Sequence, residues 1–176
     1  MASVLIAIIY LAFVSMGLPD ALLGSAWPAI YEKMGVPVSY AGLVTILIAS
    51  GTVISSLLSN RMLRRFGTGA VTVSCTALTA LALFGFSFSR AFWQLCLWAL
   101  PYGLGAGAID AALNNYVALH YKSRHMNWLH CFWGVGAATG PYIMGLCLAG
   151  GLRWNSGYLA IGLIQVALVA CLIFAI

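Results

Sequence analysis

Acidic residues are scarce in this sequence, and their scarcity sets the first limits on what the protein is. Of the 176 residues, three are Asp or Glu and eight are Lys or Arg, while 63% are hydrophobic. A soluble domain of this length cannot bury that much apolar surface. The net charge of +5 therefore does not predict a nucleic-acid partner, because the few cations lie in short connectors, where they set membrane topology. The composition predicts a multi-pass integral membrane protein in contact with the lipid bilayer.

Motifs for enzymatic or metal chemistry are missing as well. The five cysteines form no CxxC pair and no metal-ligand spacing, and the sequence has no H-E-x-x-H motif. An intramembrane serine protease needs a Ser nucleophile in a Gly-rich motif with a partner His, and Gly24-Ser25 is only a weak match. We therefore expect neither an enzyme nor a bound metal or cofactor.

Apolar stretches long enough to cross a membrane make up most of the chain. A spanning helix needs about 20 mostly apolar residues, and the sequence divides into six such stretches with short polar connectors. They are expected at about 3–30, 40–59, 70–88, 92–119, 127–149 and 156–176, the first of them interrupted by Pro19 and Pro28. The predicted fold class is an all-α membrane protein, with a single six-helix transmembrane bundle over residues 1–176.

The connectors between these stretches differ in positive charge. The second and fourth carry Arg61, Arg64, Arg65, Lys122 and Arg124, and the first, third and fifth carry Lys33, Arg90 and Arg153. Cytoplasmic loops are enriched in Lys and Arg. The second and fourth connectors, and with them both termini, are therefore predicted to be cytoplasmic, in a bacterial inner membrane or a plasma membrane.

Two of the acidic residues lie inside apolar stretches, in segments that match each other. Gly17-Leu18-Pro19-Asp20-Ala21-Leu22-Leu23 and Gly107-Ala108-Ile109-Asp110-Ala111-Ala112-Leu113 share Gly, Asp, Ala and the last Leu in register, ninety positions apart. An ionisable residue inside a membrane span is costly and marks a functional pathway. The first and fourth spans point in opposite directions, so the match predicts an inverted 3+3 repeat, with repeat one at about 1–88 and repeat two at about 92–176.

The fourth span carries small and polar residues on one side. Gly103, Gly107, Asp110 and Asn114 follow steps of four, three and four residues, which places them on one helical face. Asn115 lies about 100° away from Asn114. The glycines are predicted to allow close helix contact. Asp110 and the two asparagines are candidates for binding a solute or proton, or alternatively for hydrogen bonds that hold neighbouring helices together.

The first and fifth predicted spans also contain residues that could bind a solute or a proton. Pro19 removes a backbone donor and opens the helix beside Asp20. Asp20 is then a candidate for loading and releasing protons, since desolvation disfavours a charged carboxylate; alternatively it only caps a helix near the outer interface. His130 is either a substrate or proton ligand or a side chain that reaches the cytoplasmic interface. Trp133 is either a platform for a sugar ring or part of an interfacial aromatic belt.

Together these segments resemble the major facilitator superfamily, and within it the fucose permease-like branch. The connector at 60–69 is similar to the superfamily's loop between spans two and three, with Arg65-Phe66-Gly67 retained and Arg64 where an Asp is usual. Gly136-x3-Gly140-Pro141-x3-Gly145 resembles the fifth-span Gly-Pro motif, which is predicted to form a tight, kinked helix contact. Gly107-x2-Asp110-x3-Asn114, followed by Asn127-x2-His130-x2-Trp133-Gly134-x-Gly136, resembles the branch.

The resemblance implies the N-terminal half of a major facilitator fold. In the branch, acids on the first and fourth spans take part in proton coupling and sugar binding, and Asp20 and Asp110 occupy the matching places. The expected function is a proton-coupled secondary transporter, or half of one, which moves a sugar or similar small polar solute by alternating access. Its partner would be a second copy in a homodimer or a missing C-terminal half. The alternative is a non-transporting membrane interaction or scaffold module, or an inactive truncated half.

Overall fold

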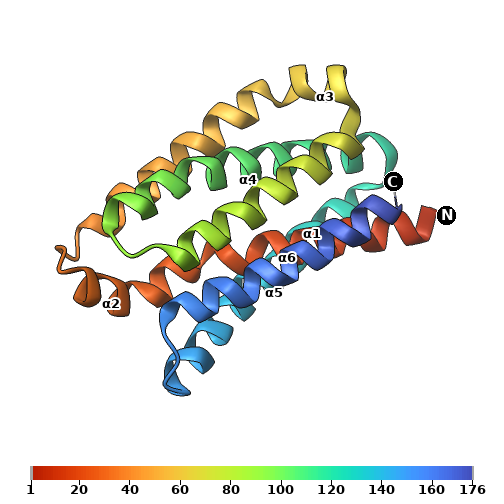
Figure 1. The fold of residues 1–176 in the computed structure, drawn as a ribbon. Helices are drawn as coiled ribbons and strands as arrows, with labels where there is room; N and C mark the ends of the chain where they lie inside the picture. Colours follow the sequence, from red (N-terminus) through yellow and green to blue (C-terminus); the bar gives the residue numbers. More distant parts are fainter. Residues whose placement is uncertain (1, 176) are drawn as a thin grey trace.

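The computed structural model describes residues 2–175, with the side chains of 5–174, and these residues form an elongated helical bundle (Figure 1). The helices are α1 (Ala2–Asp20), α2 (Leu22–Met34), α3 (Tyr40–Phe88), α4 (Phe92–His120), α5 (Ser123–Ala149) and α6 (Trp154–Ala175). In a membrane every backbone polar group must be satisfied within the protein, so long apolar runs become helices. Met1 and Ile176, which the predicted bundle included, lie outside the described residues.

Five helical segments of the described chain, not the expected six, are long and apolar enough to cross a membrane. They are Leu5–Met34, Tyr40–Phe88, Phe92–His120, Ser123–Ala149 and Trp154–Phe174. The predicted second and third spans both lie in α3, because the segment expected as a polar connector at 60–69 is helical apart from one bend. The bend is at Gly67, where φ is 79° and ψ is 160°, values that glycine adopts without steric cost. Figure 1 shows α3 turning back on itself.

The first predicted span is divided after Asp20 and not at Pro28. Ala21, with φ −98° and ψ 0°, separates α1 from α2, and α2 continues through Pro28. Pro19 has no N–H to donate to the carbonyl of Ser15, four residues earlier. The side-chain amide of Gln165, on α6, donates to that carbonyl instead, at 2.9 Å. A side chain from another helix thus compensates for the proline in α1.

Gln165 is almost completely buried, and its Oε1 also accepts a hydrogen bond from the Thr79 hydroxyl at 2.8 Å. We expect Gln165→Leu to lower the stability of the protein by about 1–3 kcal/mol, because the Ser15 carbonyl loses its partner away from water. The measurement is the thermal unfolding midpoint in detergent. The control is Thr139→Val, since the exposed Thr139 hydroxyl bonds only to its own helix. Equal midpoints for the two variants would contradict this role of Gln165.

Helices α1 and α5 touch through glycines. A Cβ atom added at Gly17, Gly136 or Gly140 would collide with the backbone carbonyl oxygen of Trp133, Val14 or Leu18, respectively. These contacts leave no room for a side chain, so the two backbones pack directly on each other. Pro141 follows within α5 without ending the helix.

Helix α4 packs in the same manner between the two arms of α3. A Cβ atom at Gly103 or Gly107 would collide with the carbonyl oxygen of Ile48 or Thr52 on the first arm, and one at Gly105 would approach the second arm at Thr79. The hydroxyl of Thr52 also donates to the Gly103 carbonyl, at 3.3 Å. Small residues and a hydrogen bond from a side-chain hydroxyl to a backbone carbonyl thus bring α4 close to both arms of α3.

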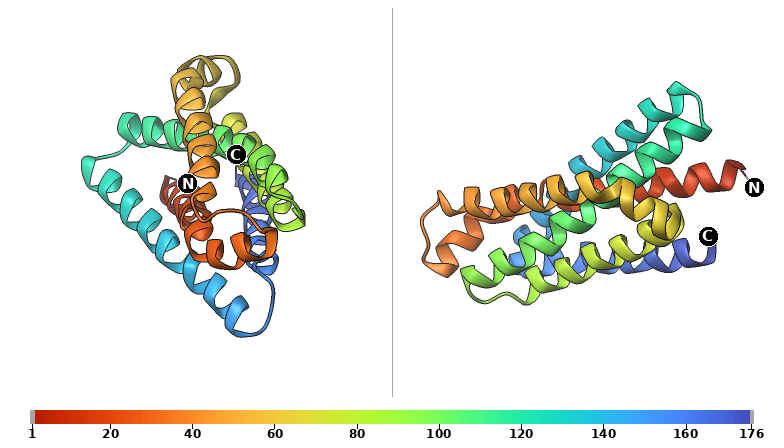
Figure 2. Two further views of the ribbon diagram at one scale, coloured as in Figure 1. Left: turned by 90° about the vertical axis from the view of Figure 1, so that its left-hand side faces the viewer. Right: turned by 90° about the horizontal axis from the view of Figure 1, so that it is seen from above.

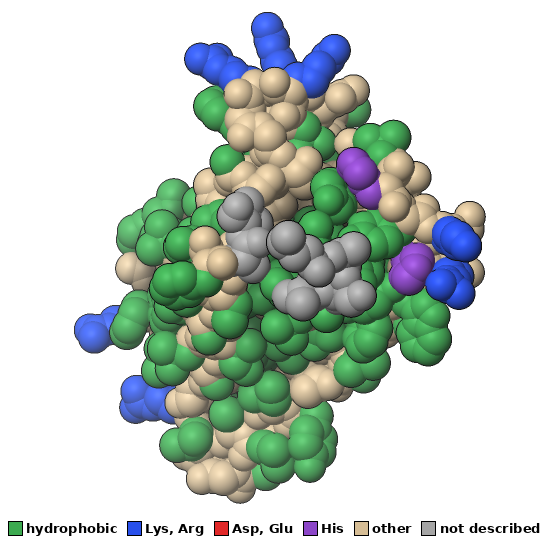
Figure 3. Space-filling view, turned by 90° about the vertical axis from the view of Figure 1, so that its right-hand side faces the viewer, with side chains coloured by type: hydrophobic (Ala, Val, Ile, Leu, Met, Phe, Trp, Pro, Cys, Tyr) green, Lys and Arg blue, Asp and Glu red, His purple; other side chains and the backbone are tan. Residues whose placement is uncertain are grey.

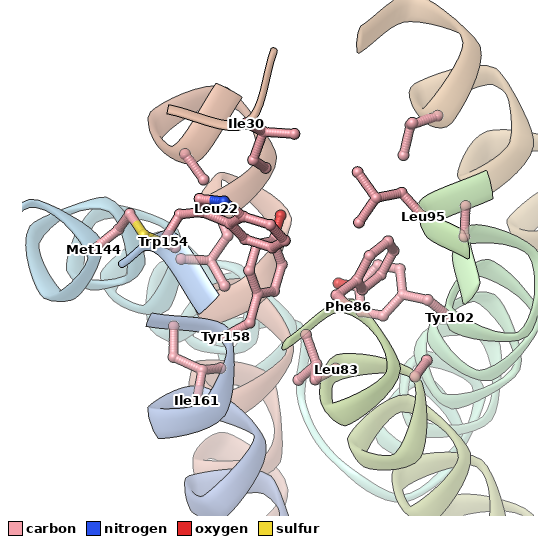
Figure 4. Packing of buried hydrophobic residues seen from close by; sticks show 14 of the residues in the cluster. Leu22, Ile30, Leu83, Phe86, Leu95, Tyr102, Met144, Trp154, Tyr158 and Ile161 are labelled. Atoms are coloured by element: carbon pink, nitrogen blue, oxygen red, sulfur yellow. The ribbon is translucent and has the colours of Figure 1, made fainter. Parts of the chain in front are cut away.

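Large side chains fill the rest of the interior in two clusters. One cluster joins the ends of the helices around α2, and Figure 4 shows its aromatic members, with Tyr102 beside Phe86 and Tyr158 beside Trp154. The other cluster includes Phe13, Ile109, Leu113, Leu129 and Leu168. Many apolar side chains remain outside, among them Leu57, which is 78% exposed. An apolar exterior of this kind suits a protein surrounded by lipid.

The two ends of the bundle differ in charge. The beginning of α1, the end of α6, the bend of α3 and the α4–α5 turn lie at one end (Figures 1 and 2). We call it the terminal end, and Figure 3 shows Lys and Arg side chains around its rim. By position in the chain it carries Arg61, Arg64, Arg65, Lys122 and Arg124, and the opposite end carries Lys33, Arg90 and Arg153. The connectors predicted to share one side of the membrane therefore share one end of the bundle.

Candidate functional site

Asp20 lies at the break between α1 and α2, near the middle of the apolar segment Leu5–Met34. Its side chain is exposed on the bundle and is held by two aromatic donors. The Tyr102 hydroxyl donates to Oδ1 and the Trp133 indole nitrogen donates to Oδ2, each at 2.8 Å. One carboxylate thus ties α1 to both α4 and α5.

Asp110 lies on α4 and is also exposed. The side-chain amide of Asn114, one turn later, donates to its Oδ1 at 3.0 Å. Asp110 lies close enough to Asp20 and to His130 for electrostatic interaction with each. The two acids and the histidine therefore lie within electrostatic range on one side of the bundle. We refer to Asp20, Asp110, Asn114, His130 and Trp133 as the polar face.

The remaining predicted site residues have different surroundings. Asn115 is exposed and makes no side-chain hydrogen bond to another described residue. His130 is exposed with its ring edge-on to Phe13, at 6.2 Å between centroids. The Trp133 side chain is 39% exposed, so part of its ring stays accessible while its nitrogen binds Asp20. The structure thus brings five of the six candidate binding residues together in the polar face. Asn115 follows Asn114 in the chain, but its side chain has no hydrogen-bond partner among the described residues.

The residues predicted for conformational roles fall into two regions. Gly103 and Gly107 are buried against α3, and Gly136 and Gly140 are buried against α1, in the contacts described above. Arg65 and Gly67 lie at the bend of α3, where the Arg65 guanidinium sits 5.4 Å from the centre of the Phe66 ring. The glycine contacts therefore support the helices that carry the polar face, while Arg65 and Gly67 belong to the terminal end.

Tyr102 is a partner that the sequence alone did not reveal. It is 4% exposed, it packs edge-on against Phe86, and its hydroxyl reaches Asp20 across the bundle. Together with Asp20 and Tyr158, Tyr102 lines a cavity of about 210 Å³. Two features of the sequence could have indicated Tyr102. It lies eight residues before Asp110, slightly more than two helical turns, and a buried phenol needs a hydrogen-bond partner.

Comparison with known proteins agrees with this architecture of long apolar helices. Residues 9–176 match the Major Facilitator Superfamily. The chain belongs to this superfamily of membrane transporters, which confirms the superfamily expected from the sequence. A curated yeast protein, "Bypass of stop codon protein 6" of Saccharomyces cerevisiae, is 25% identical over 150 residues, covering 84% of this chain and 30% of the yeast protein. The chain thus spans less than a third of the length of that relative.

Proposed function

We propose that the chain is a secondary active transporter, or half of one, that moves a sugar or similar small polar solute together with a proton. The observation that carries this proposal is that Asp20 and Asp110, both exposed, lie within electrostatic range of each other on a bundle with few other charges. Ionisable residues inside membrane spans are costly and line substrate or proton pathways. The polar face supplies such a pathway with both acids and hydrogen-bond donors.

Each member of the polar face has a proposed role in transport. A charged Asp20 accepts hydrogen bonds from α4 and α5, and a proton on this carboxylate weakens both charge-assisted bonds. Protonation then loosens α1 from its two neighbours and favours one facing state over the other. Asp110 binds the proton or a solute hydroxyl beside His130, and the amides of Asn114 and Asn115 supply further polar contacts. The accessible part of Trp133 provides a surface for a sugar ring.

We also propose that α3 crosses the membrane twice, which makes six spans. Its 49 residues correspond to roughly 73 Å of helix, more than twice the hydrocarbon thickness of about 30 Å. The packing supports an inverted 3+3 repeat, because the equivalent glycines Gly17 and Gly107 each meet the backbone of a neighbouring helix. The excess of cations at the terminal end supports a cytoplasmic location for this end.

The polar face of this bundle is open, and we propose that a second six-span bundle covers it. Asp20 and Asp110 are exposed, and contact with lipid tails would be costly for either carboxylate. A second copy of the chain or a further segment of a longer protein would enclose the pathway between two halves, as in other transporters built from repeats. Rocking of the two halves would then expose the site to each side of the membrane in turn.

A panel of neutral monosaccharides, including fucose, galactose and glucose, tests this function by thermal shift in detergent. We expect one or more sugars to raise the unfolding midpoint, since a ligand at about 100 times its Kd stabilises the folded state by about 2.7 kcal/mol. The shift should be lost in Asp20→Asn and kept in Glu32→Gln, because the exposed Glu32 lies near the end of α2, away from the polar face. No shift with any sugar, or an equal shift in both variants, would favour a non-transporting module.

A further inference from the structure

The end of the bundle opposite the termini contains a hollow of about 550 Å³ that gathers three cations. Lys33 comes from the last turn of α2, Arg90 from the α3–α4 connection and Arg153 from the α5–α6 connection. The described residues offer no carboxylate that pairs with any of the three. Glu32 neighbours Lys33 in the sequence but forms no ion pair with it, and three converging cations against one acid create a potential that attracts anions. We refer to this place as the basic hollow.

The backbone around Arg90 is fixed by local hydrogen bonds. The amides of Arg90 and Ala91 both donate to the side-chain oxygen of Gln94, at 2.6 and 3.2 Å. The hydroxyl of Ser89, itself a lining residue, donates to the Gly85 carbonyl at 2.7 Å. The connection from α3 to α4 is therefore a tight turn, and the Arg90 side chain leaves it from a defined position.

The connection that carries Arg153 is joined to the same place. The Ser87 hydroxyl donates to the Asn155 carbonyl at 2.9 Å, and the Asn155 side-chain amide donates back to the Ser87 carbonyl. This reciprocal pair ties the end of α3 to the first turn of α6. The backbone segments that carry Arg90 and Arg153 are thus fixed before any ligand arrives, which reduces the entropic cost of binding.

The basic hollow also has an apolar lining. Phe88 and Leu152 line it and are 72% and 56% exposed, and Leu159 lines it further along α6. The first turn of α6, with Asn155 and Ser156, also faces the hollow, and the dipole of a helix favours an anion at its N-terminus. The hollow therefore combines groups that attract an anion with apolar side chains, at the level where membrane spans end.

We propose that the basic hollow is a binding site for a phosphate group, carried by a phospholipid headgroup or by free phosphate. Two guanidinium groups and an ammonium group suit phosphate, because arginine donates paired hydrogen bonds to its oxygens. Phe88, Leu152 and Leu159 provide apolar surface for the glycerol and upper acyl carbons of a lipid. The site lies at the end of the bundle, apart from the polar face, and does not depend on the proposed transport activity.

The experiment measures the unfolding midpoint of the full chain in detergent while dioleoyl phosphatidylglycerol, dioleoylglycerol or inorganic phosphate is added. The test variant is Arg90→Gln/Arg153→Gln. One control keeps the charge, Arg90→Lys/Arg153→Lys, and the other removes two cations from the terminal end, Arg64→Gln/Lys122→Gln. Each Lys or Arg near an anionic headgroup contributes to binding. The loss of two arginines in Arg90→Gln/Arg153→Gln should therefore weaken the apparent affinity for phosphatidylglycerol about 30-fold.

We expect phosphatidylglycerol to stabilise the wild type and Arg64→Gln/Lys122→Gln equally, to stabilise Arg90→Lys/Arg153→Lys less, because lysine keeps the charge but not the paired hydrogen bonds, and to lose its effect in Arg90→Gln/Arg153→Gln. Dioleoylglycerol, which lacks the phosphate, should have no comparable effect. Stabilisation by inorganic phosphate with the same dependence on the variants would assign the site to the free anion, and stabilisation by the lipid alone would assign it to the headgroup. Equal stabilisation of all four proteins, or of none, would overturn the proposal.

Discussion

Asp110→Asn is expected to reduce sugar uptake driven by a pH gradient to the level of protein-free vesicles. An asparagine has the size of an aspartate but cannot carry a proton across the membrane. It still accepts the hydrogen bond that Asn114 donates to Oδ1 of Asp110, so the fold of α4 should be preserved. The measurement is uptake of the labelled sugar that gives the largest thermal shift, in reconstituted vesicles with an imposed gradient.

Exchange of sugar across the same vesicles provides the internal control. Exchange at equal concentrations needs no net proton movement, so Asp110→Asn should retain it while driven uptake is lost. Glu32→Gln, which removes the acid outside the polar face, should retain both activities. Driven uptake that is unchanged in Asp110→Asn would show that this carboxylate has no role in coupling.

The second large effect is expected from Gly136→Ala/Gly140→Ala. The Cβ atoms added at these positions meet the carbonyl oxygens of Val14 and Leu18, and a backbone cannot move aside as a flexible side chain does. Overpacking of this kind costs about 1–3 kcal/mol per site, against a total stability of about 5–15 kcal/mol for a typical domain. We expect the double variant to separate α1 from α5 and to lose much of its folded fraction in detergent, as read from the unfolding midpoint.

Two other glycines of α5 serve as matched controls. Gly134 and Gly145 have open space where a Cβ would be added, so Gly134→Ala/Gly145→Ala makes the same chemical change without a collision. Alanine is a better helix former than glycine by about 1 kcal/mol, so this variant should be at least as stable as the wild type. A similar loss of stability in both double variants would show that the α1–α5 contact is not the cause.

The helices could largely be predicted from the sequence, because long apolar runs in a membrane have few alternatives. The fourth predicted span, 92–119, differs from α4 by one residue at its end, whereas the fifth begins at Ser123 rather than at 127. Polar residues after His120 were assigned to a connector, but a helix can extend beyond the hydrocarbon region into water. Hydropathy marks where the membrane begins and does not mark where a helix ends.

The segment at 60–69 shows the same limitation more strongly. Its arginines predicted a connector between two helices, and the structure continues the helix to a bend at Gly67. Arginine, leucine and methionine are good helix formers, so charge alone gave no reason for the helix to stop. Only the glycine allows the backbone conformation that turns the chain.

The candidate site was partly visible in the sequence. Asp20 and Asp110 stood out because an acid inside an apolar span is costly, and the structure places them within electrostatic range of each other. The hydrogen bond from Tyr102 to Asp20 joins residues 82 positions apart, and no helical periodicity relates α1 to α4. Contacts of this kind depend on how the helices pack, so they required the structure.

The most direct test of the central claim is the pH of weakly buffered medium when sugar is added outside vesicles that contain the protein. Coupled entry of sugar and proton predicts a rise in the external pH with the wild type and no rise with Asp110→Asn. Entry of labelled sugar without any change of pH in the wild type would contradict proton coupling. An equal rise in both proteins would contradict the assignment of that coupling to the polar face.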